Sequence, residues 1–137
     1  MGICFEPIGT VRTTGGDPPR HWSVSDLEGV LDIRPEYREG LSELKAGDRI
    51  AVVFHFHRSG PFTPDLLRQR KRHREETAGV FSLCSPRRPN PVGLSILDVL
   101  EVSGCRIRVR GLDMFDGTPI LDVKPWSGPD GPPRAGG

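Results

Sequence analysis

The chain has 137 residues, 35% of them hydrophobic and 27% charged, with 17 glycines and 14 prolines. This length and composition predict one domain and favour short strands and shaped loops over a helical bundle. The three cysteines, Cys4, Cys84 and Cys105, are odd in number and lack metal-type spacing, so we expect no disulfide framework and a cytoplasmic protein. The net charge is only +1, and neither a long apolar run nor a signal-peptide pattern is present, so we expect no membrane span.

Hydrophobic alternation and short apolar runs predict about seven short strands. They are expected at Phe5–Arg12, Gly29–Ile33, Arg49–His57, Gly79–Leu83, Leu94–Val102, Arg106–Gly111 and Ile120–Val123. Helical turns are expected within Pro35–Leu44 and Thr63–Glu76. This pattern predicts a mainly β fold, a small antiparallel β-barrel over residues 1–126 with one or two short helices. Residues 127–137, rich in glycine and proline, are expected to form a C-terminal tail.

The fifth and sixth predicted strands are expected to form a hairpin. Ser103-Gly104 is the expected two-residue turn, which pairs the two strands in antiparallel register. Because side chains alternate along a strand, the three arginines between positions 106 and 110 share one face and Ile107 and Val109 share the other. The second face is predicted to pack in the core.

Two polar loops interrupt the predicted strands. Ser85–Gly93 contains three prolines, which stiffen the backbone and hold two arginines and an asparagine in place. Leu112–Pro119 combines two aspartates with Gly117, which can adopt positive φ. Each loop alone is compatible with a plain surface turn. Together, one cationic and the other anionic, they predict a binding site for a zwitterionic small molecule.

Positive charge is concentrated in the middle of the chain. Residues 58–110 contain eleven basic and five acidic side chains, a net charge of +6, between segments of net charge −3 and −2. Five cations lie within seven positions: Arg68, Arg70, Lys71, Arg72 and Arg74. Such clustering is typical of a nucleic-acid or phosphate contact, and we predict that these residues bind RNA. The alternative is a solvated charged loop.

Two further features admit a catalytic or metal-binding interpretation. His55 and His57 are two residues apart on a strand and share a face, as metal ligands do. The residues that follow at once, Arg58-Ser59-Gly60-Pro61-Phe62, offer no carboxylate ligand, so we favour a polar rim position and predict no metal site. Cys84 precedes two arginines that could lower the pKa of its thiol. Because the sequence offers Cys84 no clear base, a nucleophilic role is the weaker interpretation.

The chain contains a set of motifs that occur together in one family. They are Phe5-Glu6-Pro7-Ile8-Gly9-Thr10-Val11-Arg12, Pro19-Arg20-His21, Phe56-His57-Arg58-Ser59, Arg88-Pro89-Asn90-Pro91-Val92-Gly93-Leu94 and Leu112-Asp113-Met114-Phe115-Asp116-Gly117-Thr118-Pro119. Over nearly its whole length the chain resembles the TsaA-like, or TrmO, family of S-adenosylmethionine-dependent tRNA (adenine-N6)-methyltransferases. His21 and Cys84 stand where the family has a glutamine and an arginine.

The resemblance implies a small TsaA-like β-barrel that binds S-adenosylmethionine at the interface of a homodimer. Matching motifs imply that the residues contacting or shaping the cofactor site are Pro19, Arg20, His21, His57, Arg58, Arg88, Asn90, Leu94, Leu112, Asp113 and Met114. The implied substrate is tRNA, at the exocyclic nitrogen of a threonylcarbamoyl-modified adenosine beside the anticodon.

Methyl transfer from a sulfonium requires mainly that the protein align the nucleophile, the methyl group and sulfur. A general base would take the proton of the attacking nitrogen, and we nominate Asp113 or Asp116 as the catalytic residue. The alternative function is a noncatalytic barrel that binds S-adenosylmethionine or RNA without turnover.

Overall fold

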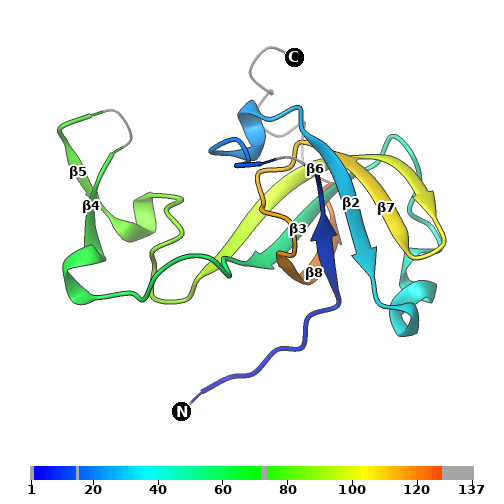
Figure 1. Ribbon diagram of the computed structural model, residues 1–137, viewed down its shortest axis with the longest axis horizontal. Coiled ribbons are helices and arrows are strands. Elements are labelled where there is room, and N and C mark those ends of the chain that lie inside the picture. Colours follow the sequence, from blue (N-terminus) through cyan, green and yellow to red (C-terminus); the bar gives the residue numbers. More distant parts are fainter. Residues whose placement is uncertain (1, 15, 72–73, 128–137) are drawn as a thin grey trace.

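The structure is a computed structural model that describes residues 2–14, 16–71 and 74–127. Its main body is a closed antiparallel barrel of six strands in the order β1-β2-β7-β6-β3-β8 (Figure 1). The barrel strands are β1 (Gly9–Arg12), β2 (Glu28–Ile33), β3 (Arg49–His55), β6 (Val92–Ser103), β7 (Arg106–Arg110) and β8 (Pro119–Pro125). The described residues include no helix long and apolar enough to cross a membrane.

The alternation of side chains along the strands explains how the barrel encloses its core. In β7, Ile107 and Val109 are fully buried while the three arginines are exposed, as the sequence predicts. The longest pairing joins β3 to β6, from Arg49 opposite Asp98 to His55 opposite Val92. β1 pairs with both β2 and β8, so the first and last strands close the barrel and leave no open edge. The mainly β, antiparallel barrel is therefore confirmed.

A second, smaller sheet lies outside the barrel. We call residues 60–71 and 74–91 the arm, which projects to the left of the barrel in Figure 1. It contains η3 (Pro64–Leu67), β4 (Arg68–Arg70), β5 (Thr77–Gly79) and η4 (Val80–Ser82), and β4 pairs only with β5. The predicted helical turn after Thr63 is present as η3, but it ends at Leu67 and gives way to a strand.

The predicted strand Gly79–Leu83 is wrong beyond its first residue. Only Gly79 belongs to β5, and Val80–Ser82 form a 3-10 turn closed by the Leu83 N–H on the Val80 carbonyl oxygen. The apolar alternation that suggested a strand instead buries Val80 and leaves Phe81 79% exposed. No barrel strand pairs with this segment, so seven predicted strands become six in the barrel and two in the arm.

Other boundaries differ by small amounts. The turn between β6 and β7 is Gly104-Cys105 rather than Ser103-Gly104, because Ser103 pairs with Arg106 and Gly104 has a φ of +61°. Helical turns are present at η1 (Trp22–Val24) and η2 (Pro35–Leu41). β1 begins at Gly9 rather than Phe5. Of the predicted tail, residues 128–137 lie outside the described residues.

Candidate functional site

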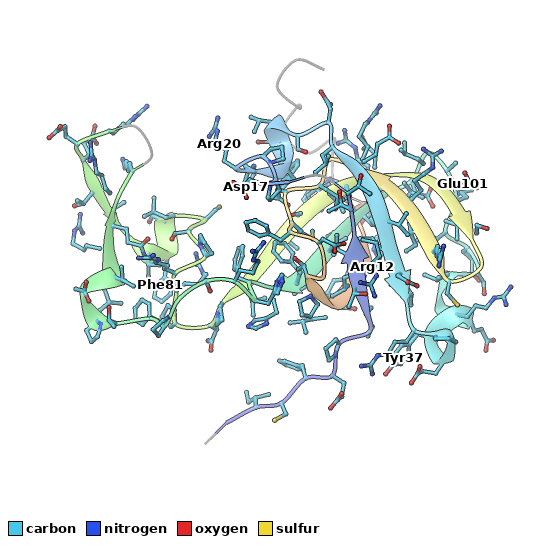
Figure 2. All side chains as sticks on the ribbon, in the orientation of Figure 1. Arg12, Asp17, Arg20, Tyr37, Phe81 and Glu101 are labelled. Atoms are coloured by element: carbon cyan, nitrogen blue, oxygen red, sulfur yellow. The ribbon has the colours of Figure 1, made fainter. Side chains whose placement is uncertain are left out.

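A cavity of about 560 Å³ lies between the base of the arm and one end of the barrel, a volume within the usual range for small-molecule sites. Its walls come from distant segments: the loop after β1, the end of β3, the base of the arm, the start of β6 and the loop between β7 and β8. In Figure 2 the labelled Asp17 and Arg20 lie on the side of the barrel nearer the arm. The tertiary fold therefore brings both predicted polar loops to one site.

Asp113 is the acidic group with the most distinctive surroundings. Its Oδ1 accepts a 2.6 Å hydrogen bond from Oγ of Ser95, which is fully buried on β6. Burial raises the pKa of Asp113, while the Ser95 hydrogen bond, the charge of His21 and the Trp22 N–H oppose that rise. A carboxylate of raised pKa is a better proton acceptor than a solvated one.

His21 is fixed in one orientation by the turn that it begins. It is the N-cap of η1, and its Nδ1 accepts a hydrogen bond of 3.2 Å from the Ser23 N–H. When the ring is neutral, Nδ1 is therefore the acceptor and the proton resides on Nε2. The ring also lies 5.1 Å from that of the buried Trp22. A polar ring at the cavity wall is thereby positioned by buried structure.

Arg58 and His57 form a cationic and aromatic rim where β3 ends. The Arg58 guanidinium lies 4.3 Å from the centroid of the Phe115 ring, a cation–π contact across the cavity wall. Burial, followed by the charge of Arg58 and the neighbouring His55, lowers the pKa of His57. This shift favours the neutral His57 imidazole, which can accept as well as donate a hydrogen bond.

The proline-rich loop is held by its own arginine. Nη1 of Arg88 donates to the carbonyl oxygens of Leu83 and Ser85, at 2.8 and 3.1 Å. At the end of this loop, a Cβ on Gly93 would lie 2.4 Å from Cζ of Phe54, which forms an edge-to-face pair with Phe56. Glycine at 93 is therefore required for these two aromatic rings to pack along the cavity.

The structure brings most of the predicted cofactor residues to the cavity wall. Nine of the eleven line it: Pro19, Arg20, His21, His57, Arg58, Arg88, Leu94, Asp113 and Met114. Leu112 is instead fully buried in the core, and the exposed Asn90 accepts the Val92 N–H on its carbonyl oxygen. Neither residue lines the cavity.

Other predicted positions lie elsewhere. Asp116 is outside the cavity and accepts a hydrogen bond from the Thr13 N–H. The predicted RNA-binding residues Arg68, Arg70, Lys71 and Arg74 belong to the arm, and Arg72 lies outside the described residues.

Cys84, His55 and His57, which the sequence analysis considered as a nucleophile and as metal ligands, line the cavity. No group of three potential metal ligands is found among the described residues.

The sequence analysis missed Trp22 and Phe115, which line the cavity, and Ser95, which does not line it but bonds to Asp113. Phe115 lies within the quoted loop, but its ring contact with Arg58 depends on the arrival of β3 beside that loop. In the sequence, Ser95 looks like an ordinary residue of a half-buried strand. The one indication of a special role was that a serine interrupts the apolar run 94–97.

Comparison with known proteins shows the family to which the chain and its fold belong. The family model described as the tRNA-methyltransferase O N-terminal domain matches residues 10–129. A Pyrococcus abyssi protein named "probable S-adenosyl-L-methionine-binding protein" is 37% identical over 128 residues, which are 90% of this chain and 68% of that protein. A Methanothermobacter thermautotrophicus protein of the same description is 38% identical and covers 92% of this chain and 91% of its own length.

Longer relatives share the same region. The human tRNA (adenine(37)-N6)-methyltransferase is 37% identical over 134 residues, covering 90% of this chain and 30% of the human protein. The crystal structure of TrmO from Pseudomonas aeruginosa superposes with a TM-score of 0.73 at 25% identity, over 98% of this chain and 62% of that one. On the strength of the family match and the shared fold, the chain belongs to the family of the tRNA-methyltransferase O N-terminal domain.

Proposed function

We propose that this protein binds S-adenosylmethionine in the cavity and transfers its methyl group to tRNA. The observation that carries the proposal is the convergence of nine motif residues, from five separate segments, on one cavity of ligand size. The names of the human and archaeal relatives agree with a tRNA methyltransferase that uses this cofactor.

The charges around the cavity suit both ends of the cofactor. Arg20 and Arg58 are exposed guanidiniums that can form paired hydrogen bonds with its carboxylate. Asp113 offers an anionic partner for the sulfonium or for ribose hydroxyls. Leu94, 56% exposed, and the buried Met114 supply apolar surface for the adenine ring. Because Arg88 already donates to two carbonyl oxygens, its main role is to shape the loop.

The protein's own residues align the reactants and receive the proton. S-adenosylmethionine supplies the methyl group and a neutral thioether as leaving group. Asp113 is the better placed of the two proposed bases, because it lines the cavity and its pKa is raised by burial, whereas Asp116 is exposed and bonded to the Thr13 N–H. Asp113 would accept the proton of the adenosine exocyclic nitrogen as the N–C bond forms.

The proposed substrate is the threonylcarbamoyl-modified adenosine beside the tRNA anticodon. The test is transfer of label from S-adenosylmethionine to three RNAs: tRNA carrying the modification, the same tRNA without it, and the modified tRNA with its target adenosine replaced. Label on the first alone is expected. Equal label on all three would contradict this substrate, and no label on any of them would contradict the transferase activity.

The arm is proposed to contact tRNA phosphates through its cations. Arg68 is held by Thr77, and Arg70 and Lys71 lie 3.9 and 3.4 Å from the carboxylates of Glu75 and Glu76. These exposed pairs are weak and can exchange partners for phosphate oxygens. The two glutamates reduce the positive potential of the arm relative to the five-cation cluster read from the sequence alone.

A homodimer is proposed to cover the apolar surface of the arm and the open side of the cavity. Leu67 and Phe81 are 49% and 79% exposed in the arm, and Val92 and Leu94 are 40% and 56% exposed where the arm rejoins the barrel. Figure 2 shows Phe81 in the projecting arm. Twofold pairing with a second copy would bury such a surface. Sedimentation equilibrium at high concentration with cofactor present is expected to give a dimer, and a monomer would contradict it.

A noncatalytic barrel that binds S-adenosylmethionine remains the second candidate. It is favoured by the Methanothermobacter protein, which is named for cofactor binding alone and is covered over 91% of its length. Calorimetry measures whether the protein binds S-adenosylmethionine, which both candidate functions require. Cofactor binding with no label in any cellular RNA would support the second candidate, and absence of binding would overturn both.

A further inference from the structure

Ser95 is a buried polar residue with no place in the site as predicted from the motifs. It lies on β6 opposite Val52, begins a run of three fully or almost fully buried residues, and has no exposed surface. It is not among the residues that line the cavity. A buried hydroxyl is unfavourable unless it is hydrogen-bonded, so the identity of its partner indicates its role.

The partner of Ser95 is a carboxylate that faces the cavity. Its hydroxyl donates to Oδ1 of Asp113 at 2.6 Å, across 18 residues of sequence. That distance lies in the range of about 2.5–2.7 Å expected when a hydroxyl bonds an ionised oxygen. The bond therefore ties the only carboxylate between residues 111 and 115 to the rigid wall formed by β3 and β6.

We propose that Ser95 is a positioning residue, which holds the Asp113 carboxylate in its charged form and in a fixed orientation for S-adenosylmethionine. The inference rests on the proposed cofactor site. Ser95 does not touch the ligand and acts through Asp113. The carboxylate also accepts from the Trp22 N–H. Because an ionised carboxylate has about four acceptor sites, sites remain for the cofactor and for the proton of the substrate nitrogen.

The electrostatic surroundings agree with this role. Burial raises the pKa of Asp113, and the Ser95 hydrogen bond is the largest influence that opposes the rise, ahead of the charge of His21. The other charged or titratable groups on the cavity wall come from the β1–β2 loop, the end of β3 and the arm: Asp17, Arg20, His55, His57, Arg58, Cys84 and Arg88. Unlike the charge of His21, the hydrogen bond from the Ser95 hydroxyl does not depend on a titrating donor, and it is the only side-chain hydrogen bond among these influences on Asp113.

The test combines two measurements on Ser95→Ala. The first is an NMR titration of the Asp113 carboxyl in the ligand-free protein, where loss of the donor is expected to move the titration to higher pH. The second is the affinity for S-adenosylmethionine across the same pH range. It is expected to fall about tenfold, for the loss of a hydrogen bond to a charged group, and its acid limb is expected to move to higher pH with the carboxyl titration.

A matched control is available in Ser25. Ser25 is also buried, but its hydroxyl donates to the carbonyl oxygen of Leu112 rather than to a carboxylate. Ser25→Ala is expected to lower stability without moving either pH midpoint. Ser95→Cys retains the volume with a weaker donor, so it is expected to give an intermediate shift and serves if Ser95→Ala does not fold.

The outcomes separate the two claims. The role of Ser95 would be overturned if the wild-type protein binds the cofactor and both Ser95 variants show the wild-type Asp113 titration and the wild-type acid limb of cofactor affinity. A shifted Asp113 titration in a protein that does not bind S-adenosylmethionine would overturn the proposed function and, with it, the cofactor part of this inference.

Discussion

The barrel and the arm contain similar short strands but are stabilised in different ways. Sixteen buried hydrophobic residues form one core cluster that draws on all six barrel strands. In the described part of the arm, Val80 is the one buried hydrophobic residue, and its two strands pair only with each other. An isolated two-stranded sheet is marginally stable in water. The barrel can therefore hold a site rigidly, while the arm is suited to contacts completed by a partner.

Removing core volume should separate the two regions most strongly. Leu97 is fully buried in β6, and Leu97→Ala is expected to destabilise the protein by about 2–5 kcal/mol through lost transfer energy and a cavity. Leu67→Ala, in the arm and 49% exposed, should cost far less. Urea unfolding of both variants measures the difference. Equal losses would show that the arm is as tightly packed as the barrel.

Removing a charged residue from the cavity wall should weaken cofactor binding, whereas removing a charge from the arm should not. Asp113→Ala and Arg20→Ala are each expected to weaken binding of S-adenosylmethionine by about 1–3 kcal/mol, the value of a charge-assisted hydrogen bond. Isothermal titration calorimetry provides the measurement, with Glu75→Gln in the arm as control. Unchanged affinity in both barrel variants would show that the site is misplaced.

Reversing charge in the arm should change RNA binding alone. Substitution of Arg68, Arg70, Lys71 and Arg74 by Glu is expected to weaken tRNA binding and flatten its salt dependence, by about 0.7–0.9 in slope per lost phosphate contact. Cofactor affinity should stay the same, because these residues do not line the cavity. Superimposable salt plots would contradict docking, and loss of cofactor binding would show that the arm and the site are coupled.

The smallest expected effect is on the free energy of unfolding, which burial of the charged Asp113 carboxylate lowers. Because burial raises its pKa in the folded state, the folded protein binds the proton more tightly than the unfolded chain, so stability decreases as pH rises from the unfolded value of about 3.9 through the folded one. Asp113→Asn should therefore be slightly more stable than wild type at pH 7, with the gain vanishing towards pH 4. Urea unfolding at both pH values tests this. A gain that is independent of pH would assign the effect to packing instead.

Local patterns were sufficient for the barrel strands and for much of the site. Alternation placed Ile107 and Val109 in the core and the arginines outside because a strand directs successive side chains to opposite faces. The family motifs selected residues of which nine line one cavity. The pattern was insufficient at Gly79–Leu83, since apolar alternation does not reveal whether a neighbouring strand exists to pair with it.

The sequence by itself determined a single antiparallel β-barrel, the identity of its family and the chemical character of two polar loops. Only the tertiary structure decided that the arm stands outside the barrel, that Asp116 does not line the cavity, and that Ser95 meets Asp113. Strand periodicity is a property of neighbouring residues along the chain. Contacts such as Ser95 with Asp113 depend instead on the order in which β3, β6 and β7 close the barrel, which no local pattern contains.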